Sequence, residues 1–409
     1  MPNFSIALTG LQADTVALNT IGNNLANLNT TAFKKQSTTF EDLFYQNIGT
    51  SGSLETLQTG VGTRVSGTSS SFAQGSMTTT QNSTDMALSG NGFFIVNRGN
   101  TQSLTRAGNF QLDSSGHLIT SSGESVMGYG AVKGQVNING GLQALQLPVA
   151  GSQSAQQTNN VVITASLNSS AAVGAQFTSP VTLYDSLGQS HGATVSYVKT
   201  GTATWNYSVA LPPGDATGTP VNSSGTLTFD SGGKLVSPTA NVTGISFPGM
   251  ADGAVALTFN MNLYDAAGQP LITQVAGSSN TSAVSQDGYA SGVYQGFSVD
   301  GAGVVSASFS NGQTSKVGQV AVATVANPGG LLRTGANDYQ ASDASGAVTV
   351  GVANSGGRAT IEGGSLEQSN VDIAAEFSDL IVAQRAFEAN SKTVTTFDTV
   401  TQQAINMIR

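Results

Sequence analysis

Several residue types are absent from this sequence or scarce in it. It has no cysteine and only two histidines, and charged residues make up 9% of its 409 residues. The absence of cysteine excludes disulfide bonds and thiol chemistry. The net charge is −9 and no cluster of lysine and arginine occurs, so the chain is not expected to bind nucleic acid or an anionic membrane.

Long apolar runs are also absent. No stretch approaches 18 consecutive apolar residues, so neither a transmembrane helix nor membrane insertion is expected. The N-terminal sequence MPNFSIALTGLQAD has no basic start and no long apolar stretch, and therefore does not resemble a cleavable secretory signal. If the protein leaves the cytosol, we expect export without signal cleavage.

Glycine and apolar residues are abundant, whereas charged residues are few. The chain has 50 glycines, and hydrophobic residues make up 39% of it. This composition favours many short strands joined by tight turns. It is not typical of disorder, because the apolar content can still build a core.

The C-terminal stretch 371–408 contains no glycine or proline and is predicted to be one long helix. Its apolar residues alternate at spacings of three and four, the pattern of a coiled-coil seam. About 37 residues at 1.5 Å each would make a rod of about 55 Å. Asn370 or Ser369 is expected to cap this helix, with Asp372 in its first turn. The predicted seam consists of Leu380, Ala383, Phe387, Val394, Phe397, Ala404 and Ile408.

Residues 3–29 carry a similar narrow apolar stripe and are predicted to form a helix that begins at Asn3. Because both end helices are long and apolar along one side, we expect them to pair with each other. The alternative is that each packs on its own globular domain. The seam predicted in the first helix consists of Phe4, Leu8, Leu11, Leu18, Ile21, Leu25 and Leu28.

Between the helices the chain has the period-two pattern of strands. The predicted fold class is therefore mainly β with long terminal α-helices, which form a coiled-coil layer, and with two β-rich domains, the outer one inserted into the inner one. Trp205 is expected to anchor the core of the outer domain. The predicted parts are a terminal helical domain (1–29 plus 371–409), a linker segment (30–75), an inner β-domain (76–150 plus 285–365) and an outer β-domain (151–284).

A short theme recurs in the β regions, an aspartate followed three residues later by a glycine. We interpret each instance as a hairpin turn in which the aspartate side chain binds the loop backbone. A calcium site is not predicted, because the carboxylates are too sparse. The theme occurs at Asp113/Gly116, Asp185/Gly188, Asp230/Gly233 and Asp265/Gly268.

No catalytic constellation is evident. His117 and His191 each lie beside a predicted turn, and the spacing suggests no carboxylate or nucleophile partner for either. The sequence therefore predicts no catalytic, cofactor-binding or metal-binding residue and no cofactor, and the chain is not expected to be an enzyme. We interpret Arg106 as a packing or intersubunit contact and not as an anion site.

The stretch from Asn23 to Lys35 carries a specific motif. Its Asn-Asn-x-Ala-Asn followed by Asn-Thr-x-x-Phe-Lys resembles the signature of bacterial flagellar rod and hook proteins. Two residues depart from it, since Gly22 stands where that family usually has alanine and Ala32 where it usually has glycine. The asparagines are expected to end the helix. The signature residues are Asn23, Asn24, Ala26, Asn27, Phe33 and Lys34.

The resemblance implies a structural protein of the bacterial flagellum. Rod proteins of the family carry only one β-domain, so the inserted outer domain favours a subunit of the flagellar hook. Such a subunit would self-assemble into a helical tube, a flexible universal joint that passes motor torque from rod to filament. The alternatives are a distal rod or hook–filament junction subunit and, from another class, a β-rich bacterial surface adhesin.

The resemblance also implies partners and a location. The partners would be further copies of this chain, the distal rod subunit below, the hook–filament junction protein above, the hook cap during assembly, and the flagellar type III export gate, reached without a chaperone. The location would be extracellular, in the hook on the basal-body side. Phe40 and Phe44 match the family's Phe-x-x-x-Phe export-recognition pattern, and they would share one face if this turn is helical.

Overall fold

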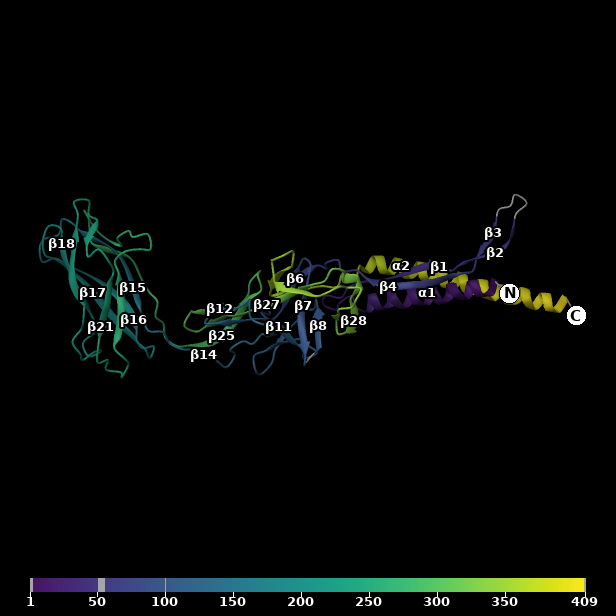
Figure 1. The fold of residues 1–409 in the computed structure, drawn as a ribbon, viewed down its shortest axis with the longest axis horizontal. Helices are drawn as coiled ribbons and strands as arrows, with labels where there is room; N and C mark the ends of the chain where they lie inside the picture. Colours follow the sequence, from purple (N-terminus) through teal and green to yellow (C-terminus); the bar gives the residue numbers. More distant parts are fainter. Residues whose placement is uncertain (1–2, 51–55, 100, 408–409) are drawn as a thin grey trace. The chain divides into compact units, whose positions relative to one another are not determined.

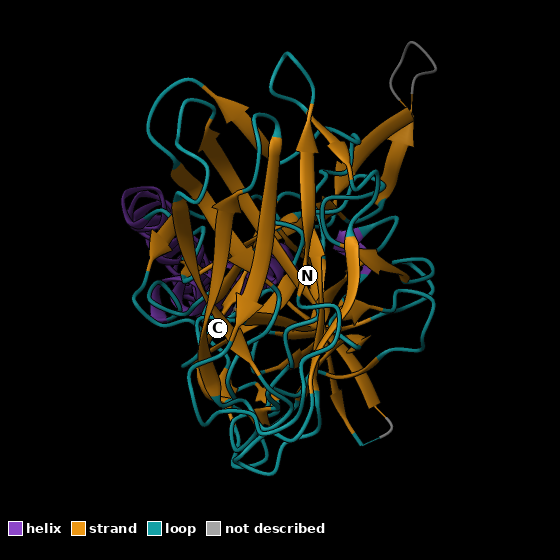
Figure 2. Ribbon diagram, turned by 90° about the vertical axis from the view of Figure 1, so that its left-hand side faces the viewer, coloured by secondary structure: helices purple, strands orange, loops and turns teal. Residues whose placement is uncertain are grey.

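The computed structural model describes residues 3–50, 56–99 and 101–407. The protein is mainly β with one long helix near each end, as predicted (Figure 1). Figure 2 shows that strands and loops make up the chain between the helices. The helices are α1 (Asn3–Ala26) and α2 (Ile373–Met407). In the described part of the chain, no helix is long and apolar enough to cross a membrane.

Helix α1 ends earlier than predicted. It stops at Ala26, and the residues that follow form turns, so Leu28 lies beyond the helix. The side chain of Asn27 donates from Nδ2 to the carbonyl oxygen of Asn23 at 2.9 Å. This bond satisfies one of the carbonyl groups that a helix end leaves without a partner, so Asn27 acts at the helix end as predicted.

The chain divides into two compact units. The first comprises the chain up to Val149, Gly296–Ala307 and the chain from Ser315, and the second comprises Ala150–Gln295 and Ser308–Thr314. The four-part division predicted from the sequence is finer than this and remains a prediction.

The segment predicted as a linker, 30–75, forms two antiparallel strand pairs in the first unit. Strand β1 pairs with β4, β2 pairs with β3, and both β1 and β4 also contact α1. Phe40 lies in β1 and Phe44 follows it, so the stretch is not helical and the spacing of four does not place the two rings on one helical face. The β-branched Thr38 and Thr39 beside Phe40 favour a strand. The bounds are β1 (Gln36–Asp42), β2 (Tyr45–Thr50), β3 (Thr56–Gly60) and β4 (Thr63–Ser70).

The main sheet of the first unit contains the path β27-β11-β7-β8-β29-β28. Strands β10, β12 and β13 pair with β11, β9 pairs with β10, and β30 pairs with β27. Two further pairs, β31 with β6 and β32 with β5, join the C-terminal approach to α2 onto this unit. Phe93, Ile95, Leu104 and Tyr339 lie in its buried core.

The remaining elements of the first unit are β5 (Met77–Thr79), β6 (Met86–Ser89), β7 (Phe93–Arg98), β8 (Thr101–Thr105), β9 (Gln111–Leu112), β10 (Leu118–Ile119), β11 (Ser125–Val132), β12 (Gln135–Val136), β13 (Gln143–Ala144), β27 (Thr314–Thr324), the short 3₁₀ helix η1 (Pro328–Gly330), β28 (Leu332–Gly335), β29 (Asp338–Gln340), β30 (Thr349–Val352), β31 (Thr360–Gly363) and β32 (Ser365–Glu367). Strands β25 (Gly292–Val299) and β26 (Val304–Phe309) each cross the boundary between the units, as does β27 at its first residue, Thr314.

The second unit is a β-sandwich. One sheet has the order β21-β22-β15-β23 with β24 on β15, and the other has the order β16-β17-β18-β19-β20. Along β17 and β18, buried and more exposed residues alternate, as they do where two sheets pack face to face. Side chains of both sheets share one core. Trp205 is 1% exposed in it, so its predicted place in the core is confirmed.

The strands of the second unit are β14 (Ser152–Gln153), β15 (Asn160–Asn168), β16 (Gln176–Tyr184), β17 (Ser190–Lys199), β18 (Thr204–Ala210), β19 (Ser224–Phe229), β20 (Leu235–Ser237), β21 (Val242–Phe247), β22 (Leu257–Asn262), β23 (Ile272–Val275) and β24 (Asn280–Gln286).

The predicted aspartate turns are confirmed. In each, Oδ1 of the aspartate accepts hydrogen bonds from the backbone N–H groups two and four residues further on, and the glycine has a positive φ. Asp300 and Gly303 form a fifth turn of the same kind, which the sequence analysis missed.

Candidate assembly site at the paired terminal helices

Helices α1 and α2 pack against each other in the first unit, as expected (Figure 1). Small and polar groups take part in this contact. Asn390 of α2 donates from Nδ2 to Oδ2 of Asp14 at 2.8 Å. Gly10 leaves room for that amide, because a Cβ there would lie 2.7 Å from Asn390 Nδ2. The buried residues of α1 are likewise small or polar, namely Ala7, Ala13, Thr20 and Asn24.

The large apolar residues of the predicted seam are only partly covered within the chain. Leu8 is 43% and Phe387 37% exposed, whereas the smaller Ala383 is 9% exposed. Ala404 is also exposed. The side chain of Phe4 and all of Ile408 lie outside the described residues. The partly exposed members are Leu11, Leu18, Ile21, Leu25, Leu28, Leu380, Val394 and Phe397.

Helix α2 exposes further apolar residues that the sequence analysis did not select. Phe377 is 52%, Ile381 58% and Val382 68% exposed. A strict alternation of three and four residues selects a single row of side chains along the helix surface. These three side chains lie on neighbouring rows and were therefore not selected. The feature of the sequence that could have identified them is the presence of large apolar residues outside the predicted row, in a helix without glycine or proline.

The N-terminus of α2 is capped by a different residue from those predicted. Asp372 Oδ1 accepts hydrogen bonds from the backbone N–H groups of Ala374 at 2.8 Å and Ala375 at 3.1 Å. Asp372 is therefore the capping residue, and neither Ser369 nor Asn370 has that role. Asn370 accepts instead from the backbone N–H of Lys35 at 2.7 Å.

Asn24 of the signature joins three segments. Its Nδ2 donates to the carbonyl oxygen of Gln36 at 2.8 Å, and its Oδ1 accepts from the N–H of Gln36 at 2.9 Å. The same amide also donates to Oε2 of Glu376 at 3.1 Å, and Lys35 Nζ lies 2.6 Å from Oε1 of Glu376. Asn24 is 1% exposed. Its position inside α1 corrects the expectation that it ends the helix; it links α1, the start of β1 and the first turn of α2.

Lys34 of the signature enters a buried ion cluster around Glu367. Lys34 Nζ lies 2.6 Å from Glu367 Oε1, and Arg106 Nη1 lies 3.3 Å from Oε2. The two cations also donate to the carbonyl oxygens of Ala73 at 2.9 Å and Gly90 at 2.6 Å. Burial lowers the pKa of Lys34, an effect that Glu367 only partly offsets. Arg106 therefore makes a buried contact inside the chain, which agrees with the packing alternative of its interpretation and not with the intersubunit alternative.

Phe33 and Ala32 complete this cluster. Arg333 donates from Nη2 to the carbonyl oxygen of Lys34, and its guanidinium carbon lies 5.1 Å from the centre of the Phe33 ring. The backbone N–H of Ala32 donates to the carbonyl oxygen of Glu367 at 2.8 Å. Ala32 has φ = 55°, in the left-handed region that favours glycine. This backbone conformation gives a physical reason for the glycine that the flagellar pattern has at this position.

Both histidines have carboxylate partners, contrary to expectation. In the first unit, His117 Nδ1 lies 3.3 Å from Asp113 Oδ2. In the second unit, His191 Nδ1 lies 2.9 Å from Asp215 Oδ2, and Nε2 lies 3.1 Å from Asp185 Oδ2. Asp215 belongs to a separate loop, so spacing along the sequence could not identify this pairing.

Asp338 is a buried acid near the signature loop. Its pKa is raised from 3.8 to about 7, first by burial and then by the hydrogen bond and negative charge of Glu124. Asp338 follows Asn337, whose Nδ2 donates to the carbonyl oxygen of Thr31 at 2.8 Å. The acid therefore lies beside a contact that holds the signature segment on the first unit.

Sequence comparisons agree with this arrangement of two end helices and two β-rich parts. Four protein-family models match the chain: "Flagella basal body rod protein" over residues 4–34, "Flagellar hook protein FlgE/F/G D1 domain" over 87–164, "Flagellar basal body protein FlaE D2 domain" over 157–289, and "Flagellar basal body rod FlgEFG protein C-terminal" over 362–407. The fold and these matches define the class, a structural protein of the flagellar rod and hook.

Relatives that match along nearly the whole chain define the family within that class. The flagellar hook protein FlgE of Rhizobium meliloti is 34% identical, with 98% of both chains covered, and that of Treponema pallidum is 32% identical, also with 98% of both covered. The chain belongs to the flagellar hook protein FlgE family and is a structural subunit of the flagellar hook. The crystal structure of Helicobacter pylori FlgE2 has a similar fold, with a TM-score of 0.53 at 15% identity over 70% of this chain and 99% of that one.

The close approach of the helices predicts opposite effects of alanine at two glycines of α1. Gly22→Ala should stabilise the helix by about 0.5–1 kcal/mol, because a Cβ there meets nothing within 4 Å and alanine has less backbone entropy to lose. Gly10→Ala should destabilise the pair by about 1–3 kcal/mol, because its Cβ would clash with the Asn390 amide. Thermal melting followed by circular dichroism at 222 nm measures both.

The double variant Gly10→Ala/Asn390→Ala separates this clash from other causes. Shortening residue 390 removes the amide that the new Cβ would meet, so the double variant should be more stable than Gly10→Ala alone. If the loss of stability in the double variant equals the sum of the losses in Gly10→Ala and Asn390→Ala, the proposed contact is contradicted.

The raised pKa of Asp338 predicts a stability that falls as the pH rises. The folded state holds the proton more tightly than the unfolded chain, so the contribution is complete below about pH 4 and is lost as the pH approaches 7. Asp338→Asn cannot ionise and should therefore raise the free energy of unfolding at pH 8 by on the order of 2 kcal/mol relative to the parent, with little gain at pH 4. Urea unfolding at both values measures this.

Asp343→Asn, at an exposed aspartate, is the matched control and should leave the pH dependence of unfolding unchanged. If Asp338→Asn and the parent lose stability equally between pH 4 and pH 8, Asp338 is not the responsible group.

Proposed function

We propose that copies of this chain polymerise into a tube that serves as a flexible universal joint, passing motor torque from rod to filament. In this proposal the terminal helices form the inner wall around an export channel, and the β-rich parts form outer layers whose mutual contacts slide. The low charge, 9% of residues, supports sliding contacts. Exposed serine, threonine and asparagine make hydrogen bonds that water can replace, with few fixed ion pairs.

The observation that carries the proposal is the apolar surface of the helix pair. Within the chain, the contacts between α1 and α2 include those of Gly10, Asp14 and Asn390, whereas Phe377 and Ile381 remain more than half exposed. A groove of about 330 Å³ between α1, β1 and α2 is lined in part by apolar side chains, among them Ile21, Phe40, Val382 and Ala386. Exposed apolar patches of this kind are typical of surfaces that bind another protein.

The exposed residues lie on more than one side of α2. Phe377 and Ile381 are four residues apart and share one face. Val382 and Val400 are separated by a whole number of helical turns, so they share a second face, rotated by about 100° from Ile381. Apolar residues on two faces support a subunit with neighbours on both sides, as in the wall of a tube.

The test is a charge placed on the first of these faces. Phe377→Asp should abolish polymerisation while both β-rich units stay folded, because an aspartate buried between subunits has no partner. Phe387→Asp, in the predicted seam, should do the same, whereas Phe377→Leu, which remains apolar, should still polymerise. Electron microscopy of concentrated protein measures assembly, and curved tubes formed by Phe377→Asp would contradict the proposed interface.

We propose partners at both ends of the tube, the distal rod subunit below and the hook–filament junction protein above, with the hook cap present during assembly. Straight rather than curved tubes would favour the distal-rod alternative. An extracellular location in the hook, reached without cleavage of a signal peptide, is part of the same proposal. Detection of the intact N-terminus in isolated hooks by mass spectrometry tests it.

We also propose that Phe40 and Phe44 are read by the export gate before the chain folds. Phe40 is 48% and Phe44 74% exposed, so neither is needed for a core. Phe40→Ala/Phe44→Ala should therefore lower the amount of exported protein several-fold without destabilising the fold. The amounts in the medium and in the cells measure export, with exposed Leu57→Ala as the control. Equal export by the double variant and the parent would contradict this role.

A further inference from the structure

His191 lies where three loops of the second unit meet. Asp185 is in the turn between β16 and β17, Asp215 in the connection between β18 and β19, and Asp252 in the connection between β21 and β22. His191 Nε2 lies 3.1 Å from Asp185 Oδ2 and 3.7 Å from Asp252 Oδ2, and Nδ1 lies 2.9 Å from Asp215 Oδ2. The His191 side chain is 6% exposed and that of Asp185 is fully buried.

The oxygens that face His191 Nε2 are held in place by the other oxygens of the same carboxylates. Asp185 Oδ1 accepts from the N–H groups of Leu187 at 2.8 Å and Gln189 at 2.9 Å. Asp252 Oδ1 accepts from the N–H of Ala254 at 3.0 Å. In each carboxylate Oδ2 is therefore directed toward the imidazole.

This arrangement differs from the other aspartate turns of the chain. Asp230, Asp265 and Asp300 bind the same two backbone N–H groups, but in the described residues none of them has a histidine partner, and Asp113 has His117 alone. Among these five turns, all of which lie in the described residues, only that of Asp185 brings a histidine together with carboxylates from two further loops.

The distances suit a small divalent ion with nitrogen and oxygen ligands. In a tetrahedral site with metal–ligand bonds of about 2.0–2.1 Å, neighbouring ligand atoms are about 3.3 Å apart. The separations of 3.1 and 3.7 Å from Nε2 bracket that value. Calcium, by contrast, takes six to eight oxygens at longer distances and makes little use of imidazole.

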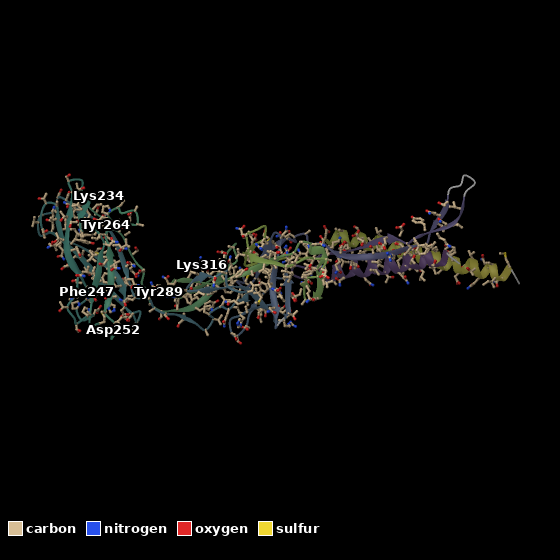
Figure 3. All side chains as sticks on the ribbon, viewed as in Figure 1. Lys234, Phe247, Asp252, Tyr264, Tyr289 and Lys316 are labelled. Atoms are coloured by element: carbon tan, nitrogen blue, oxygen red, sulfur yellow. The ribbon has the colours of Figure 1, made fainter. Side chains whose placement is uncertain are left out.

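The charges at this end of the unit favour the same ion. Among the ion pairs of the described residues, His191 is the only basic side chain that reaches Asp185, Asp215 or Asp252. Asp252 lies at the opposite end of the second unit from Lys234 (Figure 3). The Asp252 side chain is 27% exposed, which gives an ion access from solvent.

We propose that His191, Asp185 and Asp252 form a zinc site that fastens the three loops together, with Nε2 and two Oδ2 atoms as ligands and water in the fourth position. Asp215 is a positioning residue: it accepts a hydrogen bond from Nδ1–H, which leaves Nε2 free to ligate, the usual role of a carboxylate behind a zinc-bound histidine. The ion would tie the β16–β17 turn directly to the β21–β22 connection, and the hydrogen bond of His191 to Asp215 would join the β18–β19 connection to the same site.

The experiment is calorimetric titration of the full-length, chelator-treated protein with Zn²⁺. We expect one ion per chain, and at least a tenfold loss of affinity in His191→Ala and in Asp252→Asn. Asp215→Asn should weaken binding less than His191→Ala does. His117→Ala is the matched control, since it removes the only other histidine, and it should leave the affinity unchanged.

Co²⁺ provides a second readout. Bound to the parent protein, it should give the intense visible absorption of tetrahedral cobalt, and this band should be lost in His191→Ala. Near-ultraviolet circular dichroism of Trp205, the single tryptophan, reports whether each variant keeps the core of this unit folded.

Three results would overturn the proposal. The first is no Zn²⁺ binding by the folded parent. The second is equal affinity of the parent and of a folded Asp252→Asn variant, which would place the ion elsewhere. The third is tighter binding of Ca²⁺ than of Zn²⁺, which would indicate a carboxylate site without a role for His191.

Discussion

The structure of the first unit depends on one buried carboxylate, that of Glu367. It forms ion pairs with both Lys34, which follows α1, and Arg106, which follows β8, and it lies on the strand that leads into α2. Removing one partner of a buried ion pair typically costs about 3–5 kcal/mol, because the remaining charge keeps its desolvation penalty. The cluster therefore couples both ends of the chain to the β-sheet in a single arrangement.

Close to this cluster, Asn24 and Lys35 bind Glu376 in the first turn of α2. The two helices are thereby set in register at one end by polar groups, and further along by the contact of Asn390 with Asp14. Because these contacts use small and polar side chains, the larger apolar residues stay available at the surface. A subunit that must polymerise benefits from this division: polar contacts define the subunit, and apolar contacts remain for its neighbours.

The sequence was sufficient for the fold class, for the pairing of the end helices and for the aspartate turns, since each rests on local periodicity or local turn chemistry. It was insufficient for the roles of the signature residues. Asn24 looked like a helix terminator, yet it lies inside α1 and binds a residue at the far end of the chain. Phe40 and Phe44 suggested a helical turn, but pairing of β1 with β4 decided otherwise. His191 appeared unpartnered because Asp215 and Asp252 come from other loops.

By itself, the sequence determined that this chain would have two long apolar-striped helices around glycine-rich β-sheet, because helical and strand periods are properties of neighbouring residues. It also determined membership of the flagellar rod and hook class, through motifs that are contiguous in the chain. Only the tertiary structure decided which side chains form the contact between the two helices and which charges are buried together. It also decided which turn lies beside a histidine that contacts three aspartates. Those features arise from contacts between segments far apart in sequence, and local pattern carries no information on such contacts.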